Sequence, residues 1–170
     1  MSELRTNRIV PRDGLPSGSS GGIIQVKQVI KKDQFTTSNN TSNYTDLTGL
    51  SVDITPTRSD SKILVEAHIY NSNNNAVNFF RILRGSTFIE QPSGTSSSGA
   101  GYNAHAFAYY NADNWQDSTV IEILDSPATT SATTYKIQMA VTSNTGTINK
   151  FYNTSNYYGI STITAMEVSG

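Results

Sequence analysis

The sequence predicts an all-β protein, an antiparallel β-sandwich of the jelly-roll type with an extended N-terminal arm. Leu50, Val52 and Ile54 alternate with polar residues, and the same two-residue period resumes from Ile63 to Ile69 after a polar turn. Because successive side chains of a strand point to opposite faces, this period indicates strands with one buried face. Ser, Thr and Asn supply 59 of the 170 residues, a composition that favours strands and turns. No segment shows a helical period.

The strands follow one another along the chain with polar or glycine-rich turns between them. Residues 1–22 form a Pro-, Gly- and Ser-containing arm that cannot build a core, so the sandwich domain spans residues 23–170. In the first strand, residues 23–31, we expect Ile24, Val26 and Ile30 to share a face. Short edge pieces follow at 35–37 and 44–47. We expect residues 50–55 and 62–71 to pair as a hairpin, with Ile63, Val65, Ala67 and Ile69 facing the core.

A second hairpin is expected from residues 78–84 and 87–90, around Gly85. A long loop of small residues, 91–101, comes next. The remaining expected strands are residues 103–110, 118–124, 133–143, 148–152 and 160–168. Eight to ten short strands at this spacing are typical of a β-sandwich.

The charge and composition exclude several classes of function. Net charge is −1 and there is no cysteine, which excludes a disulfide framework, thiolate catalysis and a Cys-ligated metal. No apolar run approaches the length of a membrane span, and the N-terminus lacks a signal core. We therefore expect synthesis in a cytoplasm, no membrane insertion and no nucleic-acid partner.

The basic residues are concentrated near the N-terminus. Six of the twelve Lys and Arg residues fall within the first 33 positions, among them Arg5, Arg8 and Arg12 of the arm. Such a segment is either a solvated tail or an anchor onto an acidic partner surface. Both interpretations remain open from the residues alone.

No residue pattern predicts catalysis, a cofactor or a metal. Glu66 and His68 project from one face of a strand, but a metal site needs a third ligand, and the only other histidine is His105. A polar outer face is the simpler interpretation. The carboxylates Asp113, Asp117, Glu122 and Asp125 cluster near Trp115, which leaves a sugar-cleaving enzyme as an alternative without a supporting spacing.

Binding is better supported than catalysis. Aromatic residues lie near loops rich in Asn, Ser and Gly, a combination suited to sugar rings or protein surfaces. We expect Phe107 to belong to the core and Trp115 to be the best exposed candidate. The candidate receptor-binding or glycan-binding residues are Trp115, Tyr109, Tyr110, Tyr157 and Tyr158.

The order of several segments resembles a family of bacteriophage virion proteins common in marine and cyanobacterial phages. The matching segments are SELRTNRI with its Pro/Gly linker, GGIIQVKQV, TDLTGLSVDITPTRSDSKILVEAHI, FRILRGSTFI, LDSPATTSATTYKIQMAV and GISTITAMEV. In that family a short N-terminal arm leads into a trimeric jelly-roll domain similar to tail-fibre tips and C1q/TNF-like heads.

The resemblance implies a homotrimer at the virion surface and an arm that docks on the particle or threads among subunits. It implies no catalytic residues. The chain has no shaft, no heptads and no β-helical repeat, so a short tail fibre or tip, an adaptor and a capsid decoration or cement protein all remain candidates. A glycan-active enzyme and a bacterial TNF-like lectin unrelated to virions are less favoured candidates.

Overall fold

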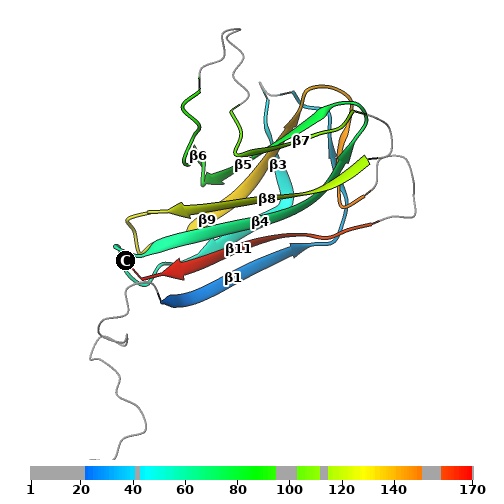
Figure 1. Ribbon diagram of the computed structural model, residues 1–170. Helices are drawn as coiled ribbons and strands as arrows, with labels where there is room; N and C mark the ends of the chain where they lie inside the picture. The colour runs from blue at the N-terminus through cyan, green and yellow to red at the C-terminus, as the bar shows by residue number, and fades with distance from the viewer. Residues whose placement is uncertain (1–21, 41–42, 95–102, 112–114, 151–157, 170) are drawn as a thin grey trace, which may run out of the picture.

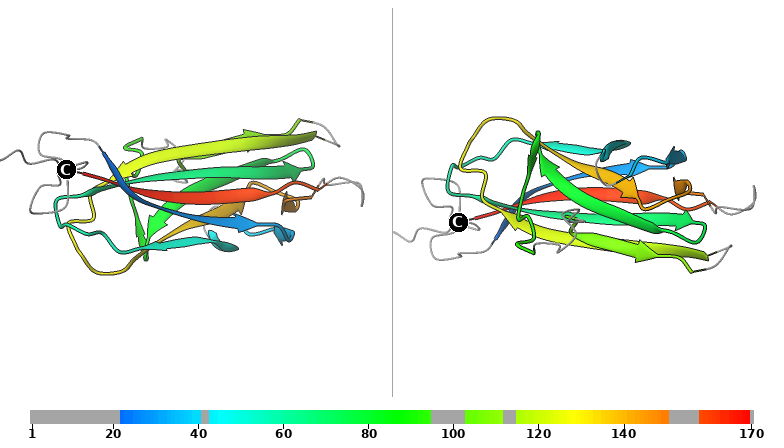
Figure 2. Two further views of the ribbon diagram at one scale, coloured as in Figure 1. Left: turned by 90° about the horizontal axis from the view of Figure 1, so that it is seen from below. Right: turned by 90° about the horizontal axis from the view of Figure 1, so that it is seen from above.

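The computed structural model describes residues 22–40, 43–94, 103–111, 115–150 and 158–169. These residues form eleven strands in two antiparallel sheets packed face to face, which confirms the predicted all-β sandwich (Figures 1 and 2). Within this part of the chain there is no helix that is long and apolar enough to cross a membrane. The predicted boundary of the arm at residue 22 stays a prediction, because residues 1–21 lie outside the described ranges.

Sheet A has six strands and sheet B has five. In sheet A the neighbours run β1-β11-β4-β10-β2, and β8 pairs with β4. In sheet B they run β3-β9-β5-β6, and β7 pairs with β5. The strands of sheet A are β1 Ile23–Lys31, β2 Phe35–Thr37, β4 Lys62–Asn73, β8 Trp115–Asp125, β10 Gly146–Ile148 and β11 Ser161–Val168. The strands of sheet B are β3 Thr45–Ile54, β5 Val77–Arg84, β6 Thr87–Phe88, β7 Ala106–Tyr109 and β9 Thr133–Val141.

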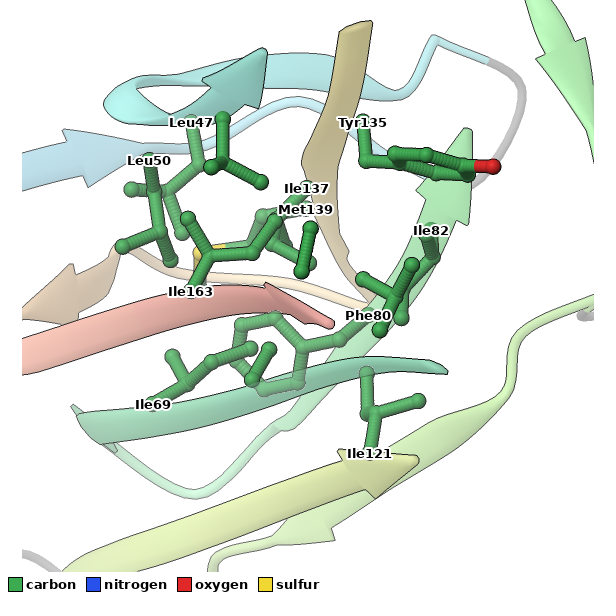
Figure 3. Close-up of a cluster of buried hydrophobic side chains, with 14 of the residues drawn as sticks. Leu47, Leu50, Ile69, Phe80, Ile82, Ile121, Tyr135, Ile137, Met139 and Ile163 are labelled. Atoms are coloured by element: carbon green, nitrogen blue, oxygen red, sulfur yellow. The ribbon is translucent and has the colours of Figure 1, made fainter. Parts of the chain in front are cut away.

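The core lies between the sheets and is supplied by alternate residues of both. Ile63, Val65, Ala67 and Ile69 of β4 are all fully buried, as their two-residue period predicts. Figure 3 shows side chains from the two sheets meeting, among them Phe80 of sheet B. Burying an aliphatic or aromatic side chain of this size stabilises a fold by about 1.5–3 kcal/mol, so the core holds the two sheets together.

The hairpin expected from residues 50–55 and 62–71 is wrong. β3 belongs to sheet B and pairs with β9, whereas β4 belongs to sheet A and pairs with β8 and β11. The connection between them crosses from one sheet to the other, where Thr57 N–H donates to the Glu167 carboxylate at 2.7 Å. The two strands bury their faces in the same core from opposite sides, so both alternate although they do not pair.

Val26 and Ile30 of the first strand share a face, as expected, whereas Ile24 lies at an irregularity in the strand. The register between β1 and β11 shifts between Ile23 and Gln25. Beyond this irregularity Val29 packs against the core, while Val26 and Ile30 are exposed on the outer face of sheet A. One extra residue in a strand reverses which side chains point inward.

The remaining strands largely follow the sequence. β5 and β6 form the predicted second hairpin, with Leu83 opposite Phe88 and Gly85 at φ +58° in the turn. The short strand at residues 35–37 is confirmed as β2. The piece expected at residues 44–47 is the beginning of β3, and β8 begins three residues earlier than predicted.

Candidate binding surface

Three exposed aromatic side chains lie at one end of the sandwich, which we call the aromatic end. Trp115 begins β8 opposite Asn73, and Tyr109 ends β7 opposite Val77 (Figure 1, right). Tyr158 forms an isolated bridge with Lys150, just before β11 begins. Their exposed fractions are 57% for Trp115, 66% for Tyr109 and 64% for Tyr158. These three candidates are therefore accessible to a ligand.

Tyr110 does not belong to this surface. Its side chain is only 1% exposed, and its hydroxyl donates to Asn71 Oδ1 at 2.5 Å. Burial raises the pKa of this hydroxyl, so it remains a donor. The ring packs beneath the aromatic end and cannot reach a ligand there. Tyr157 lies outside the described residues.

Phe107 adds a fourth exposed aromatic side chain that sequence reasoning placed in the core. It is 68% exposed, and its ring centroid lies 6.3 Å from that of Phe79. Phe107 and Tyr109 share the outer face of β7, while Ala108 between them points inward and is buried. The alternation was visible in the sequence. The small alanines fill the inner face, so the larger rings remain outside.

A buried network of amides supports the aromatic end from below. We call it the asparagine network: Asn71, Asn73 and Asn78, joined by Tyr110 and Thr119. Asn78 Nδ2 donates to Asn71 Oδ1 at 3.0 Å, and Asn73 Nδ2 donates to Asn78 Oδ1 at 2.7 Å. Asn71 Nδ2 donates to Thr119 Oγ1 at 3.0 Å. All three asparagine residues are fully buried, and their hydrogen bonds fix the strand ends that carry Trp115 and Tyr109.

Sequence reasoning missed this network because residues 71–75 look like a loop. A signal was present, however, since Asn71 and Asn73 continue the inward period of Ile63 to Ile69. The close packing around Asn78 also depends on Gly146, where an added Cβ would lie 2.7 Å from Asn78 Oδ1 and 2.3 Å from Met139 Cε.

The outer face of sheet B carries an ordered polar cluster around Arg81. The guanidinium lies 3.8 Å from the centroid of the Tyr44 ring and donates through Nε and Nη2 to Gln138 Oε1. Burial raises the pKa of Tyr44 to about 12, although Arg81 acts in the opposite direction. Gln138 in turn donates to Asp46 at 2.6 Å. Planar polar groups held in this way, with Phe107 and Tyr109 exposed on the same face, suit a ligand with many hydroxyl groups.

The candidate metal and catalytic residues do not assemble into a site. His68 contacts Glu66 on the outer face of sheet A, while His105 lies against sheet B. Ile82 N–H donates to His105 Nδ1 at 3.0 Å, so Nε2 carries the proton given to the Ile89 carbonyl. Burial lowers the pKa of His105, which favours this neutral form. Among the described residues no three His, Asp or Glu side chains are grouped as a metal site would require.

The carboxylates of β8 do not face one another. Asp125 is buried between Arg84 and Tyr135, and Glu122 faces the opposite side of the strand from Asp117. Asp113 lies outside the described residues. The candidate carboxylates Asp117, Glu122 and Asp125 are therefore not gathered into one site.

The chain enters the sandwich at the end opposite the aromatic residues. Ser169 N–H donates to the Gly22 carbonyl at 3.0 Å, so the beginning of β1 and the end of β11 lie together (Figure 1, left). Arg5, Arg8 and Arg12 precede Gly22 and lie outside the described residues. The arm is therefore joined to the end of the sandwich that carries none of the exposed aromatic side chains described above.

No family model matches the sequence, and no curated protein is similar to it. Among solved structures, the chain is similar to the VP2 subviral particle of infectious bursal disease virus, at 11% identity and a TM-score of 0.40. It is also similar to a structure of the Gx strain of that virus, at 13% identity and a TM-score of 0.38. The matches cover 98% of this chain and 42% of each viral chain. A likeness of this degree assigns neither a family nor a function.

Proposed function

We propose that this chain is a non-enzymatic structural protein of a bacteriophage virion. It is displayed at the particle surface as a homotrimer and anchored through residues 1–22, where Arg5, Arg8 and Arg12 contact an acidic partner. Its aromatic end binds glycan on the host surface, as a tail fibre or tip does. The observation that carries the proposal is that the two ends of the sandwich differ. The arm joins one end, and Trp115, Tyr109 and Tyr158 are exposed at the other.

The chemistry of the aromatic end supports a glycan. Aromatic faces stack on the apolar faces of sugar rings, and neighbouring amides and hydroxyls bond to the ring substituents. The asparagine network and the Arg81 cluster hold these elements in place before a ligand arrives. Such preorganisation reduces the entropy lost on binding.

The outer face of sheet A supports assembly with other copies. One cross-strand row there is aliphatic over four strands, and we call it the aliphatic row: Val26, Met166, Leu64 and Leu124. Val26 and Leu124 are exposed in the single chain, as are Val120 and Ile30 in a parallel row. A flat aliphatic surface of this kind is typical of a subunit contact.

The same surface also suits a second candidate, a capsid decoration or cement protein. There the trimer would coat the shell and need no receptor. Labelled antibody on intact particles separates the two functions. Binding along the tail supports the tail fibre or tip, and binding over the head overturns it in favour of decoration.

Removing residues 1–22 should abolish incorporation into particles and leave a folded trimer. A variant with Arg5, Arg8 and Arg12 changed to Gln keeps the length of the arm and should lose most incorporation as well. The measurements are the amount of protein in purified particles and the mass of the free assembly. Undiminished incorporation of the shortened protein would contradict an anchoring arm.

Changing Trp115 and Tyr158 together to Ala should weaken adsorption to host cells by about tenfold or more, because each stacking contact contributes on the order of 1 kcal/mol. The matched control is Ile23→Ala, since Ile23 is 62% exposed at the opposite end of the sandwich. Equal adsorption of both variants would remove the aromatic end from the site. Host polysaccharide incubated with the protein should stay uncut, and released oligosaccharide would instead identify an enzyme.

A further inference from the structure

Strand β8 presents a long edge that no described strand covers. All eleven of its residues pair with β4 in one unbroken register, from Trp115 opposite Asn73 to Asp125 opposite Ile63. On its other side no described strand pairs with it, and β8 lies at the edge of sheet A in Figure 1. Alternate backbone N–H and C=O groups along this edge face away from β4 and can pair with a further strand. The exception is the Ser118 N–H, which donates to Asp117 Oδ1 at 2.7 Å and would have to exchange that acceptor for the added strand.

This edge lacks the features that usually prevent strand addition. Its sequence, WQDSTVIEILD, contains no proline, glycine or lysine, and the register shows no bulge. β1, at the other edge of sheet A, differs in its exposed lysine and in its register. It carries the exposed Lys27 and has an irregular register at Ile23. Packing against sheet B does not distinguish the two edges, because β1 lies beside β3 and β8 lies beside β7. The β8 edge is the one suited to β-augmentation.

The charge of the β8 edge indicates which kind of segment it takes. Asp117 and Glu122 are exposed, and β8 has no basic residue. Glu122 lies directly opposite Glu66, a like-charge arrangement that is destabilising. His68 contacts Glu66, whereas no described cation contacts Glu122. A second β8 edge would bring more negative charge, so a basic extended segment fits better.

We propose that residues 4–10 of a second copy of this chain add to the β8 edge as an antiparallel strand. The inference rests on the proposed function, in which the arm contacts an acidic partner, and it identifies that partner for Arg5 and Arg8 as the β8 edge of a neighbouring copy of this chain. The segment LRTNRIV has two arginines, no acidic residue and no proline or glycine, and Pro11 follows it. Every pairing within sheet A is antiparallel.

The spacing of the charges selects a register. Arg5 and Arg8 are three residues apart and point to opposite faces of a strand, as do Asp117 and Glu122, five apart. Placing Arg5 opposite Glu122 puts Arg8 opposite Thr119 and diagonal to Asp117, within reach of a long side chain. Each arginine then meets one carboxylate, and the Glu66–Glu122 row gains a cation.

The length of the linker favours a second copy over the same copy. In this register residue 10 lies beside Asp117, whereas Gly22 lies at the other end of β1, three strands away. That separation is about 30 Å from strand spacing and rise. A flexible linker of the length of residues 11–21 has a root-mean-square span of about 18 Å. An arm reaching its own β8 would be stretched, while an arm from a neighbour is not constrained in this way.

Paired cysteines test the proposal cleanly because the chain has none. The full-length variant with Ile9→Cys and Ser118→Cys places the two sulfurs at directly opposite positions in the proposed register. Mild oxidation should give disulfide-linked species of two or more chains on a non-reducing gel. The control pair, Ile9→Cys with Gln28→Cys, places the second cysteine on β1 and should stay monomeric on the gel.

Charge exchange provides a second readout. Glu122→Arg should lower the yield of the Ile9–Ser118 cross-link by up to about fivefold, since opposite-charge cross-strand pairs contribute up to about that factor. Adding Arg5→Glu should restore the yield. Restoration would not follow if the arm met Ser118 only by random collision.

Each other outcome overturns the proposal. Absence of a cross-link excludes strand addition at this edge. A link confined to one chain shows that the arm docks on its own β8, and equal linking by Ser118→Cys alone shows that a second β8 is the occupant. The proposed function has a separate readout, because arm-dependent incorporation into particles can persist without the cross-link, and the cross-link can form without incorporation.

Discussion

Replacing Asp125 with Ala should lower the free energy of unfolding by about 2–4 kcal/mol, because the buried Tyr135 hydroxyl and the partly exposed Arg84 guanidinium lose their shared acceptor. Asp125 ends β8 in sheet A and is nearly fully buried. Its two oxygens accept from Arg84 Nη1 at 2.8 and 2.7 Å, and Oδ2 also accepts from the Tyr135 hydroxyl at 2.6 Å. Arg84 and Tyr135 belong to sheet B, so this carboxylate joins the two layers.

Two further variants separate the charge from the hydroxyl. Tyr135→Phe removes one donor and leaves the ion pair, so its cost should be about 1 kcal/mol. Asp60→Ala breaks a contact with Arg58 at the exposed surface and should leave the urea midpoint nearly unchanged. Equilibrium unfolding in urea measures the change in the free energy of unfolding for all three variants. A cost for Asp125→Ala no larger than that for Asp60→Ala would contradict a structural role for the inter-sheet pair.

Replacing Asn71 with Leu should destabilise the protein by about 2–4 kcal/mol although the side-chain volume is nearly kept. The leucine leaves Asn78 Nδ2 without its Asn71 acceptor and Thr119 Oγ1 without its donor. Each unsatisfied buried group costs about 1–3 kcal/mol. Asn71→Ala adds the cost of a cavity and should be less stable still.

A double-mutant cycle shows whether the network acts as a unit. Asn71→Leu combined with Asn78→Leu should cost about 0.5–3 kcal/mol less than the sum of the single changes, because the two amides no longer leave each other unpaired. The measurement is again urea unfolding, with near-ultraviolet circular dichroism to confirm the fold. Strict additivity would show that Asn71 and Asn78 contribute independently.

The sequence predicted the fold class and most strands because a two-residue period records which face of a strand is buried. Of the strand partners, it predicted the β5–β6 hairpin, where a short turn joins the two strands, but not the pairings between distant strands. β3 and β4 each alternate because each borders the core, and nothing in either strand specifies that β9 and β8 are their neighbours. Register irregularities, as in β1, also escape the pattern, since one inserted residue exchanges the two faces.

The candidate site was predicted only in part, because the two-residue period shows that neighbouring side chains face opposite sides but not which side is buried. Tyr109 and Tyr110 are adjacent in one extended segment, so a two-residue period allows only one of them to face solvent. Which one does so depends on the buried partner, and here Asn71 accepts from the Tyr110 hydroxyl. Trp115 was correctly expected at the surface, whereas Phe107 was misplaced because the inward positions of β7 are held by small alanines.

The pairing of β1 with β11 determines when the protein can finish folding. Ile23 pairs with Val168, so the first strand waits on the ribosome until almost all of this sequence has been synthesised. At about 5–20 residues per second that delay is roughly 10–30 s. During it, β4 can already pair with β8, while the side of β4 that later pairs with β11 stays open. Sheet A can thus be completed only once β11 has been synthesised, and until then the open side of β4 is accessible to a neighbouring nascent chain or a chaperone.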